Sequence, residues 1–372
     1  MRPVKTGHLW RRQLSDFTSL AIVFPMGSIY DPANRKGVSH LMEHLICKCL
    51  DKYEDRFLRD CIDYNAVTEF DYVYFYFKGL ASILTPELKQ ELVDQIINHG
   101  FDNLTEEQFN LEKQVVLQEV ADGFEDPFSG NLLNIYYKYY NQIEPGGIPE
   151  HIQEFTFEEA KQMYNDKFRR PLRIVEVNHY RTDFSHVDFL DKAPNKMPIH
   201  FKKSKRSLHP VPKGERANIF AVCKKIVKSS DYQYVAIALH MLLDGFNAPF
   251  MNEIRVKRGL AYDVSGDLER IQNHSILWLY LMTDKNNVDE VTILLKDLCQ
   301  NVRKYLTPER FKLIKEYLEN KRKIWKYFQW KHPERYIERE HAQLPIHFDK
   351  INYDDLVGIV ERYFYDMDIQ VY

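Results

Sequence analysis

The stretch from Gly37 to Ile46 constrains this chain most, because it places two histidines and a glutamate at helical spacing. Its apolar residues recur at three- and four-residue steps, which indicates a helix, and the glycine marks the loop before it. His40 and His44 therefore share one face of the helix, about 6 Å apart along its axis. At this spacing both rings can reach a single metal ion, with nitrogen-to-metal distances of about 2.0 to 2.1 Å.

Glu43 stands next to the second histidine, and the order His-x-x-Glu-His is the inverted zinc-peptidase signature. In this position the Glu43 carboxylate can take a proton from water bound at the metal. Zinc also requires a third protein ligand and an open position for that water. Cys47 lies on the same face, but it follows His40 by seven residues, about 10 Å of helix, so we reject it as the third ligand.

A second helix supplies a better third ligand. It is predicted to begin at Thr105, because Thr105 and Gln108 form a capping box. Glu112 and Glu119 interrupt an apolar stripe of this helix. Carboxylates in such a stripe are costly to bury unless they are paired or bind a metal. We therefore predict that Glu119 is the third zinc ligand and that Glu112 orients one of the ligand histidines.

These residues resemble the M16 family of zinc metallopeptidases, which includes insulinase, pitrilysin and the mitochondrial processing peptidase. That family has a ligand glutamate about 75 residues after the motif and a second glutamate seven positions before that ligand. Here Glu119 lies 75 residues after His44, and Glu112 lies seven residues before Glu119. The segment Phe24–Pro32 resembles the strand and Gly-Ser turn that precede the motif in the family.

The resemblance implies an α+β fold of two M16-like domains, each a mostly antiparallel sheet with helices packed on it. It also implies one Zn²⁺ per chain, held by the three predicted ligands, with Glu43 as the catalytic base. Asn65 and Ala66 resemble the start of the family's edge strand. In the family this strand pairs with an extended substrate, which adds a strand to the sheet.

In the second half of the chain, the segment Arg255–Tyr262 resembles the family's Arg-x-x-x-Gly-Leu-x-Tyr sequence. The resemblance implies that Arg255 and Tyr262 hold the substrate and polarise its scissile carbonyl, since both offer the fixed donors that a developing oxyanion requires. Taken alone, the residues favour a surface ion pair for the arginine and a core position for the tyrosine. Val256 departs from the commoner family sequence, in which an acidic residue often follows the arginine.

The length of 372 residues favours two domains. We expect a catalytic zinc-binding domain over residues 1–181 and an M16-like substrate-binding domain over 217–372. Between them, residues 182–216 are rich in Lys, Pro, His and Ser, which is typical of a linker. In the first domain, alternating Tyr and Phe predict a strand over Tyr64–Lys78. In the second, a long helix is predicted over Pro308–Trp330, whose aromatic end could be core or a subunit contact.

Composition excludes several classes of protein. A net charge of -3 with 44% hydrophobic residues favours a soluble globular chain and argues against a nucleic-acid-binding surface. No window approaches the roughly 18 uninterrupted apolar residues that a membrane span needs. The five cysteines are an odd number without framework spacing, which indicates reduced thiols and favours a cytoplasmic protein. Cys47 and Cys49 could form a second metal clip, although buried positions on the motif helix are favoured.

We therefore expect a zinc metalloendopeptidase that hydrolyses peptides or unfolded polypeptide segments. Half-length relatives close a peptide-sized chamber by pairing two chains, so the resemblance implies a homodimer or a heterodimer with a paralogous chain. The leading alternative is a non-catalytic peptide-binding or scaffold subunit that keeps its ligands by descent. A third alternative is a zinc hydrolase that acts on something other than peptides.

Overall fold

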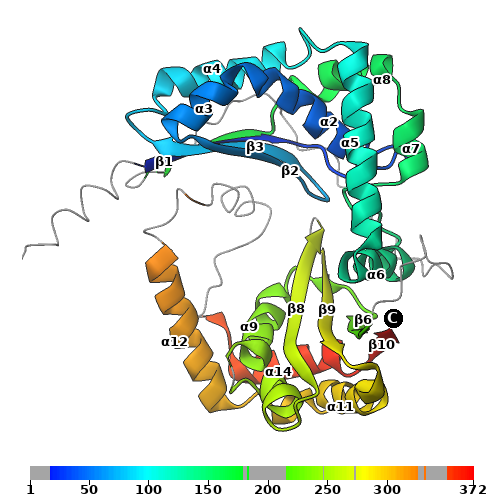
Figure 1. The fold of residues 1–372 in the computed structure, drawn as a ribbon. Coiled ribbons are helices and arrows are strands. Elements are labelled where there is room, and N and C mark those ends of the chain that lie inside the picture. The colour runs from blue at the N-terminus through cyan, green and yellow to red at the C-terminus, as the bar shows by residue number, and fades with distance from the viewer. Residues whose placement is uncertain are drawn as a thin grey trace, which may run out of the picture. The chain divides into compact units, whose positions relative to one another are not determined.

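The computed structural model describes residues 17–178, 182–183, 215–245, 247–271, 274–325, 331 and 350–372. Most of these residues form two compact units, each with an antiparallel sheet and helices packed on it (Figure 1). This is the α+β fold that the sequence predicts. The first unit includes the described residues up to 123 and from 141 to 183, and the second includes residues 124–140 and the described residues from 215 to 323 and from 350 to 372.

The sheet of the first unit has the strand order β2-β3-β1-β4-β5, with each neighbouring pair antiparallel. Its strands are β1 (Phe17–Phe24), β2 (Asp63–Thr68), β3 (Val73–Leu80), β4 (Arg173–Asn178) and β5 (Thr182–Asp183). The centre of the sheet is β1, whose apolar run from Leu20 to Phe24 is buried. At one end of the sheet, β2 pairs with β3 alone among the described strands.

Helices pack on this sheet and carry the residues of interest. They are α2 (Val38–Cys47), α3 (Glu54–Asp60), α4 (Pro86–His99), α5 (Glu106–Glu125), α7 (Pro149–Glu154) and α8 (Phe157–Met163). The motif helix α2 packs against the end strand β2. The predicted capping box at the start of α5 is confirmed, because the Thr105 N–H donates to Oε1 of Gln108 at 3.0 Å and the Gln108 N–H donates to Oγ1 of Thr105 at 3.2 Å.

The prediction of one strand over Tyr64–Lys78 is wrong, because this segment forms a hairpin of β2 and β3. The chain reverses after β2, where the Glu69 N–H donates to the Tyr72 carbonyl at 2.9 Å. The loop after β1 holds this turn, since the Ser28 N–H donates to the Glu69 carbonyl at 3.3 Å. The turn contains neither glycine nor proline, so the nearly continuous aromatic pattern concealed it.

The second unit has a sheet with the order β10-β6-β9-β7, and β8 pairs with β9 as well. Its strands are β6 (Ala217–Cys223), β7 (Val227–Lys228), β8 (Ala261–Ile271), β9 (His274–Thr283) and β10 (Met367–Val371). All of the pairings are antiparallel. Within the described residues, β8 pairs only with β9, so its other edge has no strand beside it.

Several helices cover this second sheet. They include α9 (Tyr232–Leu243), α10 (Pro249–Met251), α11 (Val288–Gln300), α12 (Pro308–Trp325) and α14 (Tyr353–Phe364). Apolar residues of α9, α11 and α14 join those of the strands in one buried core. The predicted helix over Pro308–Trp330 is confirmed as far as Trp325, while residues 326–330 and the aromatic side chains there lie outside the described residues.

A segment from the first half of the sequence also packs on the second sheet. It contains α6 (Pro127–Ile135) and the π-helical turn Tyr136–Tyr140. The ring of Phe128 lies 4.6 Å from that of Tyr280, centroid to centroid. The Tyr140 hydroxyl donates to the Cys223 carbonyl at 2.5 Å. Aromatic packing and a buried hydrogen bond therefore attach this segment to the second unit.

The predicted domain limits at residues 181 and 217 stay predictions, because most of the linker lies outside the described residues. Residues 124–140 fall within the predicted first domain, yet they pack with the second unit. Among the helices of the described ranges, none has the length and apolar character needed to cross a membrane.

Candidate metal centre

The helix α2 that carries the motif is held at its start by a residue outside it. Gly37 precedes α2 with a left-handed φ of 98° and offers no side chain to cap it. Asp31 supplies the missing cap: its Oδ2 accepts from the Gly37 N–H at 2.8 Å, and its Oδ1 accepts from the Ser39 N–H at 3.1 Å. Burial raises the pKa of Asp31 to about 6. The cap fixes the first turn of the helix, from which His40 projects.

A second loop presses against the same helix start. A Cβ on Gly147 would lie 2.1 Å from the Cα of Gly37, so neither of the two segments can carry a side chain where they cross. The Ile148 N–H donates to the Lys36 carbonyl at 3.1 Å. These contacts hold the loop and the helix start together. The left-handed φ of 84° at Gly147 is a second reason for glycine at this position.

Three predicted ligands come together between α2 and α5. The His44 Nε2 lies 3.4 Å from Oε2 of Glu119, and the His40 Nε2 lies 3.8 Å from the same oxygen. One ligand atom from each residue lies within 4.8 Å of the others. The two imidazole rings meet edge to face, with centroids 4.9 Å apart. Glu119 lies on the exposed side of the cluster, with 57% of its side chain accessible.

The donor set suits zinc. Two imidazoles and one carboxylate are the ligands of a catalytic zinc site that keeps a position open for water. Burial and the neighbouring His44 lower the pKa of His40 to about 4, so its ring is neutral near pH 7, which is the form that binds a metal. The Nδ1 of His40 is buried and has no hydrogen-bond partner within the described part of the chain.

Glu112 lies about two helical turns before Glu119 on α5 and contacts the other side of His44. Its Oε2 is 3.6 Å from the His44 Nδ1, and only 15% of its side chain is exposed. The Glu112 Oε1 also lies 3.6 Å from the Lys48 ammonium, whose positive charge offsets the carboxylate. One nitrogen of His44 therefore faces Glu112 while the other faces Glu119, as in a carboxylate–histidine–metal arrangement.

Glu43 is buried beside the cluster. Its Oε2 accepts a hydrogen bond from the Thr68 hydroxyl at 2.6 Å, and burial raises its pKa. Cys47 does not belong to the three-residue cluster found among the described residues. Burial raises the pKa of the Cys47 thiol well above its usual range, which disfavours the thiolate that binds a metal.

Asn65 and Ala66 lie on β2, the strand at the end of the first sheet. The Ala66 N–H donates to Oδ1 of Asn65 at 2.9 Å. Antiparallel strands direct alternate N–H groups toward the partner strand and away from it. A side chain that accepts from the backbone N–H of the next residue therefore covers a donor on the outer edge, where a further strand would pair.

Arg255 and Tyr262 lie in the second unit. The guanidinium carbon of Arg255 is 4.4 Å from the centroid of the Tyr262 ring, a cation–π contact. Tyr262 is 76% exposed, so its interpretation as a core tyrosine is wrong. Val256 points to solvent as well. The Arg255 guanidinium therefore lies against the ring of Tyr262, which follows it across a short loop.

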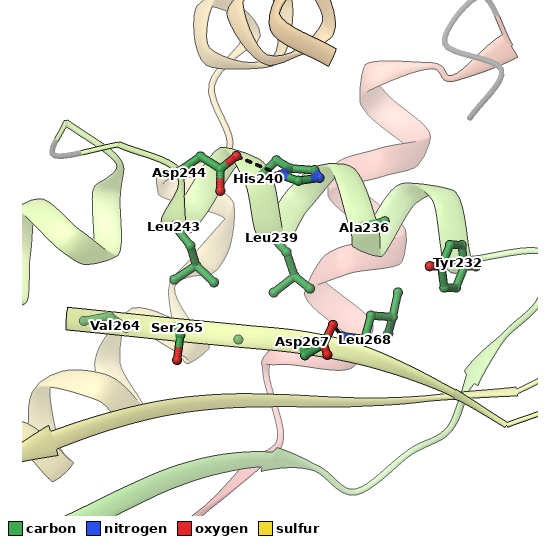
Figure 2. A pocket seen from close by; sticks show the side chains of 11 residues that line it. Tyr232, Ala236, Leu239, His240, Leu243, Asp244, Val264, Ser265, Asp267 and Leu268 are labelled. Carbon is green, nitrogen blue, oxygen red and sulfur yellow. Dashed lines mark hydrogen bonds and ion pairs between the residues drawn. The ribbon is translucent and has the colours of Figure 1, made fainter. Parts of the chain in front are cut away.

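A groove of the second unit runs between α9 and the outer edge of β8 (Figure 2). The cavity measures about 350 Å³ and is lined by five consecutive residues of β8, 264–268, which means that the strand presents its edge to it. The Leu268 N–H donates to Oδ1 of Asp267 at 2.7 Å. On α9, the His240 Nδ1 lies 2.8 Å from Oδ2 of Asp244. The groove thus repeats a feature of β2, an outer donor covered by the preceding Asp or Asn.

Sequence reasoning missed three residues that support the metal cluster or the helix that carries it. Asp31 lies too far before the helix to be recognised as a cap. Thr68 falls within the predicted strand over Tyr64–Lys78, but no sequence pattern indicates its bond to Glu43. The third, Glu144, is a half-buried carboxyl whose pKa is raised by burial and by the nearby Glu119. No sequence pattern singles it out, and in the structure its Oε2 accepts from the Gly146 N–H at 3.2 Å.

Comparisons with known proteins agree with the fold. Residues 10–142 match a family model described as insulinase (peptidase family M16), and residues 179–318 match one described as peptidase M16 inactive domain. A protease from Helicobacter pylori is 17% identical in a structural superposition with a TM-score of 0.72, covering 96% of this chain and 93% of that chain. No curated protein sequence matches this chain.

Two more solved structures share the fold. A peptidase M16 inactive domain from Pseudomonas fluorescens is 16% identical with a TM-score of 0.69, over 96% of this chain and 92% of its own. A chain of complex III2 from Candida albicans is 12% identical with a TM-score of 0.69, over 96% and 90%. Identities this low establish the fold alone. The two family models together cover most of this chain, and they show that it belongs to the M16, or insulinase, family of peptidases.

Proposed function

We propose that this chain is a zinc-dependent endopeptidase that hydrolyses peptides or unfolded polypeptide segments. The observation that carries the proposal is the convergence of His40, His44 and Glu119, whose ligand atoms lie within 4.8 Å of one another. Glu43 projects from the same helix as the two histidines, and Glu112 contacts His44 from behind. These residues lie in the part of the chain that matches the insulinase model.

The residues divide the chemical work between them. A bound Zn²⁺ supplies a Lewis acid for the peptide carbonyl and lowers the pKa of water. Glu43 accepts the proton of the attacking water and returns it to the leaving amine. Burial raises the pKa of Glu43, which strengthens it as a base. Glu112 faces the His44 ring at Nδ1, which would leave Nε2 to bind the ion together with Glu119.

We assign the substrate to the outer edge of β2. An extended peptide would replace the Asn65 side chain at the Ala66 N–H and continue the antiparallel sheet. Such pairing reads the backbone of the substrate more than its side chains, so the enzyme would tolerate many sequences. The α9–β8 groove of the second unit offers an edge of the same kind, with Asp267 covering the Leu268 N–H, and we assign it to an extended segment as well.

Arg255 and Tyr262 are our candidates for holding the scissile segment from the second unit. Tyr262 is exposed and Arg255 lies against its ring, so both can offer donors to a carbonyl that gains negative charge. This assignment rests on their resemblance to the family's Arg and Tyr pair.

We also propose a dimer, either of two copies or with a paralogous chain, and a cytoplasmic location. The chain covers 93% of the Helicobacter pylori protease chain, which fits a half-length member that pairs to close a chamber. None of the five cysteines is in a disulfide, in agreement with a reducing compartment. The Candida albicans neighbour comes from a multi-subunit complex, which shows that the fold can serve in an assembly.

A non-catalytic peptide-binding or scaffold role is the second candidate. It is favoured by the Pseudomonas fluorescens structure, whose name describes an inactive domain, and by the same description for the model matched by residues 179–318. In this alternative the β2 and β8 edges would still bind extended peptides, but no bond would be cut.

Cleavage of a mixed peptide library, read by mass spectrometry, separates the two. We expect the zinc-loaded wild type to cut peptides and Glu43→Gln to bind zinc without cutting. If both proteins hold zinc and neither cuts, with or without a candidate partner chain, the peptidase proposal fails and the scaffold role replaces it. Cleavage that persists in Glu43→Gln would overturn the assignment of the base.

A further inference from the structure

We propose that Thr68 is a positioning residue for Glu43, and that it ties the orientation of the base to the strand on which the substrate pairs. The inference rests on the proposed peptidase function and deepens it by assigning a residue that no comparison assigns. It is carried by one hydrogen bond between two buried side chains of different elements.

Thr68 is the last residue of β2, and Glu43 lies in the middle of α2. The Thr68 hydroxyl donates to Oε2 of Glu43 at 2.6 Å, and both side chains are buried. A hydrogen bond to an ionised carboxylate is roughly twice as strong as one between neutral groups. Among the residues that the structure describes, Thr68 is the only hydrogen-bond donor to this carboxylate.

The bond divides the two oxygens of Glu43 between separate tasks. Oε2 is engaged by Thr68, which leaves Oε1 for the proton of the attacking water. Without the threonine hydroxyl, the carboxylate could rotate about χ3, because this terminal torsion of glutamate has no sharp preference. The rate of a reaction between positioned groups falls steeply when they are less well aligned, because the entropy lost in aligning them then adds to the activation barrier.

The position of Thr68 in β2 connects it to the substrate. Ala66 lies two residues earlier, and both side chains are buried on the face of the strand toward α2. A peptide that pairs with the outer edge at Ala66 would fix the end of β2, where Thr68 holds the base. Substrate pairing and orientation of the base thus meet in one short strand.

The test compares Thr68→Val, which keeps the shape and removes the hydroxyl, with Thr68→Ser, which keeps the hydroxyl. Thr18→Val is the matched control, because Thr18 is a buried strand threonine of the same sheet whose hydroxyl bonds Lys89 and the Val177 carbonyl. Zinc content, kcat and KM are measured on a peptide found to be cut. Crystal structures of the metal-free proteins report the rotamer of Glu43.

We expect Thr68→Val to lower kcat about 10- to 100-fold with KM and zinc content unchanged, and Thr68→Ser to recover most of the rate. Thr18→Val should lose stability but keep kcat. In metal-free crystals the Glu43 rotamer should change in Thr68→Val and stay in Thr68→Ser. A Thr68→Val enzyme with wild-type kcat, or a Thr68→Ser enzyme as slow as Thr68→Val, overturns the inference.

The two proposals fail separately. If the wild type cuts no peptide, the peptidase function is lost, and the crystal rotamers still decide whether Thr68 orients Glu43. If the wild type cuts and the Glu43 rotamer is the same in all three proteins, the peptidase function stands and the positioning role is wrong.

Discussion

Asp31 caps the start of the motif helix by accepting two hydrogen bonds from Ser39, one from the backbone N–H at 3.1 Å and one from the hydroxyl at 2.5 Å. Burial raises the pKa of this carboxyl from its ordinary 3.8 to about 6. The folded protein therefore holds the Asp31 proton more tightly than the unfolded chain does. The stability that this proton contributes is complete below pH 3.8 and is lost as the pH rises through 6.

We predict that Asp31→Asn, which cannot ionise, removes this pH dependence. Relative to the variant, the metal-free wild type should lose on the order of 3 kcal/mol of unfolding free energy between about pH 4 and 7. Urea unfolding at several pH values gives the difference directly, and other titrating groups cancel in it. A difference that does not change with pH would contradict the raised pKa.

Gly147→Ala should destabilise the protein more than its backbone angle alone explains. A Cβ there would meet the Cα of Gly37 at 2.1 Å, whereas a Cβ at Gly245 would meet nothing within 4 Å, although φ is 84° and 85° at the two positions. Gly245→Ala is thus the matched control for the cost of φ, about 1 kcal/mol. We expect Gly147→Ala to lose about 1 to 3 kcal/mol more in denaturant unfolding. Equal losses would mean that the two loops separate easily.

Glu112→Gln should weaken zinc binding without unfolding the chain. The carboxylate stands 3.6 Å from the His44 Nδ1, and its loss removes the charge that orients the ring and makes it more basic. We expect zinc affinity, measured by competition with a chelator, to fall about 10- to 100-fold. Glu107→Gln on the exposed first turn of the same helix is the control and should leave the affinity unchanged. Wild-type affinity in Glu112→Gln would remove this glutamate from the site.

Tyr262→Phe should slow cleavage while leaving zinc content and stability near those of the wild type. The Tyr262 side chain is 76% exposed, so removing its hydroxyl breaks no buried contact. If the hydroxyl donates to the developing oxyanion, kcat should fall about 100- to 1,000-fold. Tyr365→Phe, at another exposed tyrosine of the second unit, is the control. An unchanged kcat would leave the resemblance to the family's Arg and Tyr pair without a catalytic meaning here.

Local chemistry made part of the fold predictable. The capping box of Thr105 and Gln108 lies within four residues, so sequence spacing was enough to locate the start of α5. The histidine pair of α2 is equally local. The meeting of Glu119 with these histidines was predictable because its carboxylate interrupts an apolar stripe, and the family's spacing points to the same residue; no local rule alone brings two segments 75 residues apart into contact.

The missed features depend on contacts between distant segments. Glu69 turns the chain without glycine or proline, held by the loop after β1. Thr68 donates to Glu43, which lies 25 residues earlier in the sequence. Tyr262 is exposed, although taken alone it favours a core position. Each depends on which surfaces the tertiary fold places together, and a single sequence read in short windows does not contain that information.

The two halves of this protein cannot be separated with one cut. Tyr140 donates to the carbonyl of Cys223 from a segment that lies 83 residues earlier in the chain, and Phe128 covers Tyr280. A fragment that begins at residue 215 would contain the whole second sheet but lack the segment 124–140 that packs on it. Its aromatic face would be open to water, and a separately made piece containing residues 124–140 would have to bind there before the fragment could become soluble and stable.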